Sequence, residues 1–522
     1  MGQSPVPEHP SHWGGLSHGR SGRVPEFLTK SHYSQGLACR KWLWLAFNQP
    51  DRLTGADEKD LHRFNEGHRI GELARQRFPG GVLIEEKDPK ANLQRSQELV
   101  RKRVPLFEAG FLHPDGKSYA KADVLRPVGK DQWDLVEVKS SGSVKEEHLH
   151  DVAFQLRCYT GAGLKVRKCS LLLVNTAYVR SGDVDVSALF QEVDVTADVS
   201  ALTPKVPAYV KDLLAVIGRE SCPEFGKGDP FHKDDLGFHE DDSLWSEHPG
   251  SDILDLYRGG QKKLDLLESG IYKIQDIPQG DLNAKQTLQQ EAHLTGKPKV
   301  DPKKIAAFLA KLEYPLHFLD FETFQTVVPL FDGARPYQQV PFQYSLHVVE
   351  KPGERPRHHS YLSLAPEDPR SGFAAALRKD LGPRGNIIAW NISFEKGRLK
   401  ELAAFLPEHT AWTQLADGRF VDLMQPFADF AYYHPKQGGS VSLKAVLPAL
   451  TGVDYQGLEI SDGGMASLAY LQTVWGAEFG SSATESEAKS TRLALEKYCG
   501  QDTEGMVLIL EKLEELAANG KG

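Results

Sequence analysis

Several features that define whole classes of protein are scarce in this sequence of 522 residues. Its five cysteines are scattered and no two form a CxxC pair, which argues against a disulfide scaffold or a zinc finger. No apolar run approaches the length needed to cross a membrane, and the N-terminus lacks the apolar core of a signal peptide. We therefore expect a cytoplasmic protein without a membrane partner.

Positive charge is not in excess either, since 62 Lys and Arg stand against 71 Asp and Glu, a net charge of −9. A protein coated with polyanion-binding surface would be basic, so any such surface is expected to be a local groove. Hydrophobic residues at 40% and charged residues at 25% are ordinary for a globular protein. The length is sufficient for about two to four domains with separate cores.

Composition separates a tail, two chemical domains and a connector. Residues 1–24 are rich in Gly, Pro, Ser and His and are predicted to be a disordered tail. We place the chemical domains at 25–225 and 313–518, with a helical connector at 226–312 between them. The first domain is expected to begin with one helix along residues 27–45, whose aromatic and aliphatic face packs into the core.

The connector contains a helical stretch over residues 253–277. Its part 261–271 resembles one helix-hairpin-helix unit, in which a Gly-Ile turn holds a nucleic-acid phosphate. The alternative, which we favour, is a helix that stops at a C′ glycine, Gly270. Residues 284–300 are polar and are expected to form a linker before a helix at 302–313.

Charged side chains gather on two predicted strands of the first domain. The strand 120–125 carries Asp123, and the strand 133–140 carries Glu137 and Lys139, which share one face because they are two residues apart. Two carboxylates on neighbouring strands suit a divalent ion, and a lysine beside them suits a developing phosphorane charge. The alternative is a hairpin whose solvent face carries Asp, Glu and Lys.

Two further elements add polar residues to this set. A predicted helix over residues 148–159 places Gln155 and Tyr159 one turn apart on the same side. An earlier helix, which ends near Pro79, carries His68. A lone helical histidine is more often structural than catalytic. His68 is therefore a candidate site residue only because other motifs of the domain support it.

That order, an Asp, then E-x-K, then Q-x-x-x-Y, resembles the RecB-like branch of the PD-(D/E)XK nucleases, which includes the nucleases of CRISPR adaptation. The resemblance covers residues 25 to about 225 and implies metal ligands, a catalytic lysine and substrate-orienting residues. The implied metal ligands are His68, Asp123 and Glu137. Lys139 would be the catalytic lysine, and Gln155 and Tyr159 would orient the substrate.

Many relatives of that branch hold an iron–sulfur cluster with four cysteines. Here Cys39 and Cys222 lie in the corresponding regions, and the stretch 222–235 contains no further cysteine. Two thiolates do not make the usual four-ligand site. We therefore predict that the cluster is absent.

A pair of acids marks the second domain. Residues 316–324 are predicted to form an apolar strand on which Asp320 and Glu322 leave the same face. Burying two adjacent carboxylates is costly, and Mg²⁺ or Mn²⁺ would offset the cost. The alternative is an edge strand whose polar face lies in water.

Later acids follow in a recognisable order. After an apolar strand at 386–390, Asn391 ends the strand and Glu395 lies at the start of the next helix; Asp422 follows another strand. On a late helix, Tyr498 and Asp502 are four apart and share one face. Singly, these are explained as a first-turn acid, a cap and a surface pair.

Together, D-x-E, N-x-x-x-acid and Y-x-x-x-D resemble the DEDDy exonucleases of the ribonuclease H-like fold, over residues 313 to about 515. By that resemblance four acids would bind two divalent ions about 4 Å apart, which activate a water and stabilise the leaving oxygen. These acids are Asp320, Glu322, Glu395 and Asp502. Tyr498 would hold the attacking water, Asn391 would contact substrate, and Asp422 would support the ligands. Glu395 departs from the pattern, because better-known members have Asp there.

Both halves together resemble a bacterial family in which a RecB-like nuclease is fused to a ribonuclease H-like domain of unknown function. The stretches that carry this resemblance are 151–155, 336–347 and 439–444. The expected fold class is α/β, with a PD-(D/E)XK restriction-endonuclease-like domain, a helical connector and a ribonuclease H-like mixed-sheet domain.

The sequence therefore predicts a Mg²⁺- or Mn²⁺-dependent phosphodiesterase with two sites. Its expected partner is single-stranded or frayed DNA rather than RNA, with 3′→5′ polarity at the second site, in DNA repair or in defence against foreign DNA. Two alternatives stay open. One is a nucleic-acid-binding or assembly protein with inactive sites, and the other is an RNA exonuclease.

Overall fold

A computed structural model describes residues 26–53, 58–223, 250–476, 478–479 and 483–519. The predicted tail and the first part of the connector lie outside the described residues. The chain divides into two compact units. The N-terminal unit comprises residues 1–178 and 183–249, and the C-terminal unit comprises residues 179–182 and 250–522. No helix in the described ranges is long and apolar enough to cross a membrane.

A mixed sheet forms the centre of the N-terminal unit, with the order β2-β3-β4-β5-β6-β7 and β1 paired to β4. β4 is antiparallel to β3 and β5, whereas β5 and β6 are parallel. The strands are β1 (Leu28–Thr29), β2 (Val82–Leu83), β3 (Leu106–Leu112), β4 (Ser118–Val128), β5 (Gln132–Lys139), β6 (Lys165–Val174) and β7 (Phe190–Asp194).

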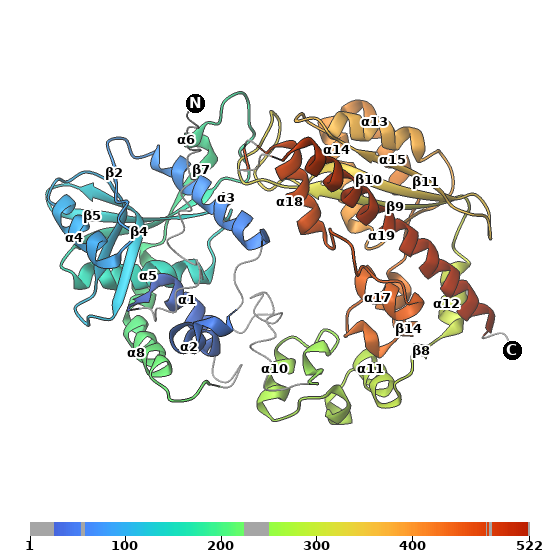
Figure 1. Ribbon diagram of the computed structural model, residues 1–522, viewed down its shortest axis with the longest axis horizontal. Helices are drawn as coiled ribbons and strands as arrows, with labels where there is room; N and C mark the ends of the chain where they lie inside the picture. The colour runs from blue at the N-terminus through green and yellow to red at the C-terminus, as the bar shows by residue number, and fades with distance from the viewer. Residues whose placement is uncertain (1–25, 54–57, 224–249, 477, 480–482, 520–522) are drawn as a thin grey trace, which may run out of the picture. The chain divides into compact units, whose positions relative to one another are not determined.

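Helices of this unit pack on the sheet and on one another (Figure 1). They are α1 (Lys30–Ala38), α2 (Arg40–Asn48), α3 (Glu58–Arg75), α4 (Pro89–Val100), α5 (Glu146–Gly161), α6 (Val186–Leu189), α7 (Thr196–Leu202) and α8 (Val206–Ile217). α5 packs across β4, β5 and β6, so the helix that follows the E-x-K strand covers that strand.

The single helix expected along residues 27–45 is wrong. A short strand and two helices occupy this stretch, because Cys39 is extended (φ −149°, ψ 108°) and separates α1 from α2. Its thiol accepts the N–H of Trp42 at 3.3 Å and so caps the second helix. The Thr29 side chain caps the first helix.

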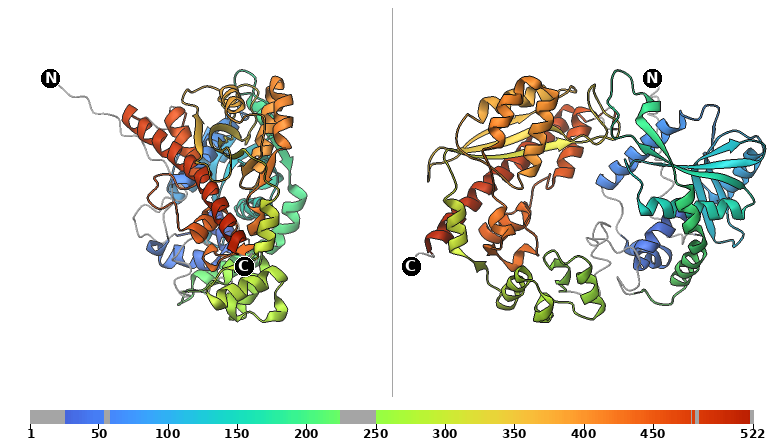
Figure 2. Two further views of the ribbon diagram at one scale, coloured as in Figure 1. Left: turned by 90° about the vertical axis from the view of Figure 1, so that its right-hand side faces the viewer. Right: turned by 180° about the vertical axis from the view of Figure 1, so that it is seen from behind.

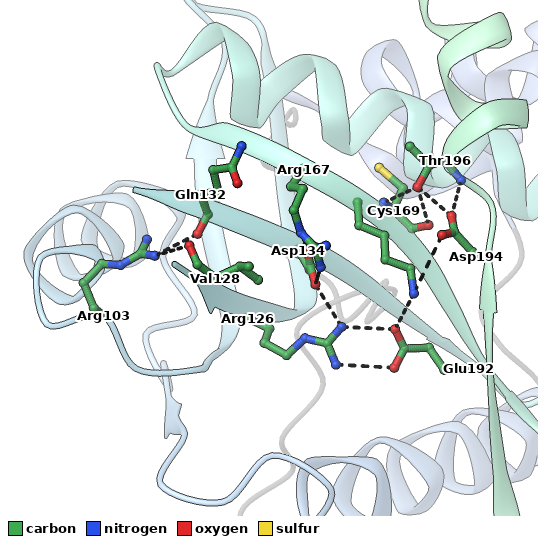
Figure 3. Close-up of polar contacts among 11 residues, drawn as sticks. Arg103, Arg126, Val128, Gln132, Asp134, Arg167, Cys169, Glu192, Asp194 and Thr196 are labelled. Atoms are coloured by element: carbon green, nitrogen blue, oxygen red, sulfur yellow. Dashed lines mark hydrogen bonds and ion pairs between the residues drawn. The ribbon is translucent and has the colours of Figure 1, made fainter. Parts of the chain in front are cut away.

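Ion pairs join four neighbouring strands of this sheet, as Figure 3 shows. Asp134 of β5 is 1% exposed and accepts from Arg126 of β4 at 2.9 Å and from Arg167 of β6 at 2.7 Å. Arg126 also pairs with Glu192 of β7 at 3.2 Å. Because each charge has an opposite partner, the network holds the strand ends together.

The C-terminal unit contains a second mixed sheet with the order β11-β10-β9-β12-β13. β9, β10 and β11 are antiparallel neighbours, and β12 and β13 continue the sheet in parallel with β9. The strands are β9 (Leu316–Phe324), β10 (Val340–Val349), β11 (Arg357–Leu362), β12 (Ile387–Ala389) and β13 (Phe420–Asp422); β8 (Lys299–Val300) and β14 (Tyr432–Tyr433) pair separately.

Helices cover both faces of this sheet. The helices are α10 (Gln261–Glu268), α11 (Ala284–Thr295), α12 (Pro302–Leu309), α13 (Arg370–Asp380), α14 (Ser393–Phe405), α15 (Thr410–Asp417), α16 (Gln425–Ala428), α17 (Leu443–Thr451), α18 (Gly463–Val474) and α19 (Glu485–Asn519). α19 crosses one face of the sheet (Figure 1). α13, α14 and α15 cover the other face in the reverse view of Figure 2.

The polar linker expected at residues 284–300 is wrong, because α11 occupies most of it. Gln286, Gln289 and Gln290 are buried in this helix, and their amide groups donate to backbone carbonyls of residues 255–277. Before it, α10 ends in a turn at Gly270 (φ +80°), whose amide donates to the carbonyl of Leu267. This agrees with the C′ glycine that we favoured.

Two candidate metal centres

Asp123 and Glu137 lie next to each other in the N-terminal unit. β4 and β5 pair with Val124 opposite Val136, so continuing this register places Asp123 opposite Glu137. The Asp123 carboxylate accepts the backbone N–H of Val138 at 2.7 Å. The predicted pairing of these two acids on neighbouring strands is therefore present.

A pocket of about 460 Å³ opens beside these strands. His68 of α3 lines it together with Asp123 and Lys139, so the structure brings three predicted residues to one cavity. Arg63 and Arg75 of α3 also line the pocket. Acidic groups from the sheet and basic groups from the helix thus face the same space.

Glu137 is held by cations from two elements. It is 1% exposed, and its Oε1 forms ion pairs with Lys30 of α1 and, at 3.0 Å, with Lys139. Burial alone would raise the pKa of Glu137, but the two ammonium groups outweigh burial and hold the pKa below its usual range. Burial and the nearby Glu137 charge raise the pKa of Asp123 to about 7.

Lys139 forms a second ion pair, with Asp151 of α5 at 2.5 Å. Burial would lower the pKa of Lys139, but Glu137 and Asp151 outweigh this effect and raise it. The lysine is therefore charged and fixed between two carboxylates. Asp151 and Lys30 were not among the predicted site residues, and Lys30 is 107 residues away from its partner in sequence.

Gln155 and Tyr159 are both fully buried under the sheet. The Gln155 amide donates to Glu137 Oε2 at 2.6 Å, and the Tyr159 hydroxyl accepts the N–H of Ala122 at 2.8 Å. In this arrangement their hydrogen bonds hold α5 against β4 and β5. Their expected contact with substrate stays a prediction.

The acid pair of the C-terminal unit lies on the face of β9 that α19 covers. Leu319 and Phe321 point into the core below α13 and α14, so Asp320 and Glu322 point to the opposite face. Oxygen atoms of these two acids and the Cys499 sulfur lie within 4.8 Å of one another. The predicted side-by-side placement of the two carboxylates is confirmed.

Glu395 reaches the same region from the end of β12. Asn391 is exposed and left-handed (φ +63°), and its N–H donates to the Asp422 carboxylate at 3.0 Å, which turns the chain into α14. Glu395 follows in the first turn and is 2% exposed. Its Oε2 is buried and has no hydrogen-bond partner among the described residues.

α19 supplies the remaining predicted residues, Tyr498 and Asp502. The Tyr455 hydroxyl donates to Asp502 Oδ1. The Tyr498 hydroxyl also lies close enough to lower the pKa of this carboxylate. The helix is held against the sheet by Gln343 of β10, whose amide donates to the Leu495 carbonyl at 2.9 Å. One helix register therefore places both residues beside β9.

The pKa values of all four acids are raised. Burial raises the pKa of Asp320 well above its usual range, and the charges of Asp502 and Glu322 add to it. Burial likewise raises the pKa of Glu322 to about 8, of Glu395 to about 8 and of Asp502 to about 6. Four acids with raised pKa values, three of them buried and Asp320 partly buried, fit a site for divalent cations, and Glu395 has an unpartnered oxygen among the described residues.

Three residues of this region were not predicted to belong to the site. Cys499 lies 3.8 Å from Asp320 Oδ2, Tyr455 contacts Asp502, and Lys444 lies over the Tyr455 and Tyr498 rings. Lys444 ends the stretch 439–444 that carried the family resemblance, which was a signal available in the sequence. The other two give no sequence signal, because their contacts come from packing.

Known proteins give limited similarity. A family described as "Domain of unknown function (DUF2779)" matches residues 317–442. A Mycoplasma pneumoniae protein described as "Uncharacterized protein MG366 homolog" is 27% identical over 237 residues, which are 41% of this chain and 34% of that protein. The chain thus spans about a third of that relative. No solved structure matches the present chain. The family match begins within the strand that carries Asp320 and Glu322 and ends before α19.

Proposed function

We propose that the protein is a nuclease that hydrolyses phosphodiester bonds of DNA at two centres dependent on Mg²⁺ or Mn²⁺. One observation carries this proposal, the convergence of four carboxylates in the C-terminal unit, three of them buried and one partly buried. In the absence of a cation their repulsion and burial destabilise the protein. A bound divalent cation would offset this cost.

The expected folds form part of the proposal. For the N-terminal unit it is a PD-(D/E)XK fold, supported by an Asp and an E-x-K motif on paired strands and by Q-x-x-x-Y on the covering helix. For the C-terminal unit it is a ribonuclease H-like fold, supported by the mixed sheet whose strand β9 carries D-x-E.

In the C-terminal centre Asp320, Glu322, Glu395 and Asp502 would hold the ions. Bound Mg²⁺ or Mn²⁺ supplies Lewis-acid chemistry that activates a water and offsets charge on the leaving oxygen. Burial and the nearby acids raise the pKa of Tyr498, so its hydroxyl stays protonated. The phenol has one proton, directed towards Asp502, so its oxygen would accept a hydrogen bond from the attacking water and orient it.

In the N-terminal centre His68 and Asp123, which line the pocket described above, would hold the ion together with Glu137. Lys139 is charged and fixed by Asp151, so its ammonium would face the negative charge that develops on the phosphate. Arg63 and Arg75, which also line the pocket, would bind flanking phosphates. A pocket of this volume suits one nucleotide-sized group and favours single-stranded or frayed ends.

Degradation of 5′- and 3′-labelled DNA strands tests the proposal. Wild type, Asp320→Ala, Glu137→Ala and the double variant are compared with Mn²⁺ and with EDTA. We expect loss of 3′→5′ shortening in Asp320→Ala and loss of all cleavage in the double variant. Full activity in the double variant would refute both centres, and an inactive wild type that still binds DNA would indicate a binding protein.

The same strands made as RNA separate the second enzymatic candidate, because a site must accommodate the 2′-OH. We expect faster hydrolysis of DNA. Faster hydrolysis of RNA at the C-terminal centre would identify an RNA exonuclease.

A further inference from the structure

Lys444 is a cation beside the C-terminal centre that is held entirely by uncharged groups. Its Nζ donates to the Ser461 carbonyl at 2.6 Å and lies 5.0 Å from the ring centre of Tyr498 and 5.6 Å from that of Tyr455. It forms no ion pair within 4.0 Å in the described part of the chain. An ammonium group has three donors, and the carbonyl takes one of them.

A second lysine of the same chain shows a different arrangement. Lys30 of the N-terminal unit forms a direct ion pair with its carboxylate, Glu137. A lysine that only offsets acidic charge would be expected to do the same. The Lys444 ammonium is instead anchored by a carbonyl and two ring faces, which fix its position without neutralising its charge.

Lys444 nevertheless lies close enough to act on the acids. Its charge opposes the rise in pKa of Glu322 and of Asp502. The anchoring carbonyl of Ser461 precedes Gly463, where a Cβ would lie 3.5 Å from Glu322 Oε2. Lys444 and the segment that anchors it thus form the wall of the site next to Glu322.

Lys444 has no direct ionic partner among the described residues, even near other acids. Two divalent ions would cancel the charges of the four predicted ligands. A fifth carboxylate, Asp462, also acts on Glu322, but it accepts the N–H of Met465 at 2.9 Å and forms no ion pair with Lys444 within 4.0 Å. A phosphodiester linkage carries one negative charge and supplies the missing counterpart. We propose that Lys444 binds a non-bridging phosphate oxygen of the strand at the C-terminal centre. This inference rests on the proposed function of that centre.

The salt dependence of strand binding tests this role, because each neutralised phosphate of a single strand contributes about 0.7 to the slope of log K against log salt concentration. A fluorescent single strand is titrated with Ca²⁺ in place of Mn²⁺, in a Glu137→Ala background that silences the first centre. For Lys444→Met we expect at least tenfold weaker binding and a slope smaller by about 0.7. Lys444→Arg keeps the charge and should keep the slope.

Lys512→Met is the matched control, since Lys512 lies in an exposed pair with Glu515 on α19. It should change binding by less than twofold and leave the slope unchanged. Thermal unfolding monitors integrity, and Lys444→Gln replaces Lys444→Met if the latter unfolds. A folded neutral variant with wild-type affinity and slope would overturn the role of Lys444. A wild type that neither binds nor cleaves DNA would instead refute the proposed function itself.

Discussion

Ser345 Oγ lies 2.7 Å from Thr503 Oγ1, and this hydrogen bond joins β10, the strand next to β9, to α19, the helix that carries Asp502. Ser345 of β10 pairs across the sheet with Asp320, and Thr503 follows Asp502 on α19. Both side chains are buried, and the Thr503 hydroxyl also lies 2.8 Å from His347 Nδ1. This contact therefore helps to hold α19, and with it Asp502, on the sheet beside β9.

Thr503→Val should damage both stability and the C-terminal centre. The substitution keeps the shape but leaves the Ser345 hydroxyl and the His347 ring without this partner, at a cost of about 2 kcal/mol. We expect at least tenfold slower 3′→5′ hydrolysis and unchanged cleavage at the first centre. Urea unfolding and end-labelled strands measure the two effects. Thr295→Val removes an exposed hydroxyl on α11 and serves as control. Equal effects of both variants would contradict the prediction.

Glu395→Gln should stabilise the metal-free protein while it removes metal binding. Burial raises the pKa of Glu395 to about 8, so at neutral pH the acid destabilises the folded state, by roughly 3 kcal/mol. In EDTA the variant should unfold at higher urea concentration than wild type. Mn²⁺ should stabilise wild type by about 2.7 kcal/mol at a hundred times its Kd and the variant much less.

Glu511→Gln, an exposed change on α19, is the control for this pair of measurements. It should alter neither the stability in EDTA nor the response to Mn²⁺. A Glu395→Gln variant that keeps the full response would remove Glu395 from the ligand set.

Residues within one element were predictable because periodicity determines which of them share a face. The spacing of two on β9 placed Asp320 beside Glu322, and the spacing of four on α5 placed Gln155 on the side of Tyr159. The order of these motifs along the chain also separated the two centres. Local geometry needs no knowledge of the tertiary structure, so the sequence alone was sufficient here.

Contacts between distant elements were not predictable. Lys30 reaches Glu137 across 107 residues of sequence, and no periodicity links a first-turn lysine to a later strand. The polar stretch at 284–300 misled for a different reason. Gln289 and Gln290 are buried because their amides satisfy backbone carbonyls, whereas hydrophobic patterning treats buried glutamine as exposed.

Lys30→Met should tighten Mn²⁺ binding at the N-terminal centre. The ammonium contacts Glu137 Oε1 and also acts on Asp123, so it competes with an ion for the same two carboxylates. We expect at least tenfold tighter binding, measured by electron paramagnetic resonance of free Mn²⁺ in an Asp320→Asn background. Lys90→Met, which breaks an exposed pair with Glu26, should have no effect. Weaker binding in Lys30→Met would mean that the lysine keeps Glu137 ionised for the metal.

Asp134→Ala should destabilise the N-terminal unit without altering chemistry per folded molecule. It leaves Arg126 and Arg167 without their shared carboxylate (Figure 3). Breaking a fully buried pair costs more, but both arginines keep solvent contact, so we expect roughly 2 to 3 kcal/mol. Chemical unfolding measures this loss. Asp131→Ala breaks the exposed pair with Lys165 and should change stability little; a similar loss there would contradict the role of burial.

His317 gives the C-terminal unit a stability that depends on pH. It is 3% exposed on β9, and its Nδ1 lies 3.2 Å from the Asn386 carbonyl oxygen. Burial, with the nearby charge of Arg419, lowers the pKa of His317 to about 4. In the unfolded chain a histidine has a pKa near 6.5, so the unfolded state binds the proton first as the pH falls.

Stability from His317 is therefore complete above pH 6.5 and is lost as the pH falls from 6.5 towards 4. Between pH 7 and pH 5 this amounts to about 2 kcal/mol. His317→Gln cannot titrate, so its urea midpoint should fall less over this interval than that of wild type. His359→Gln, a more exposed change on β11, should follow wild type. Parallel curves for wild type and His317→Gln would show that the buried ring does not titrate on unfolding.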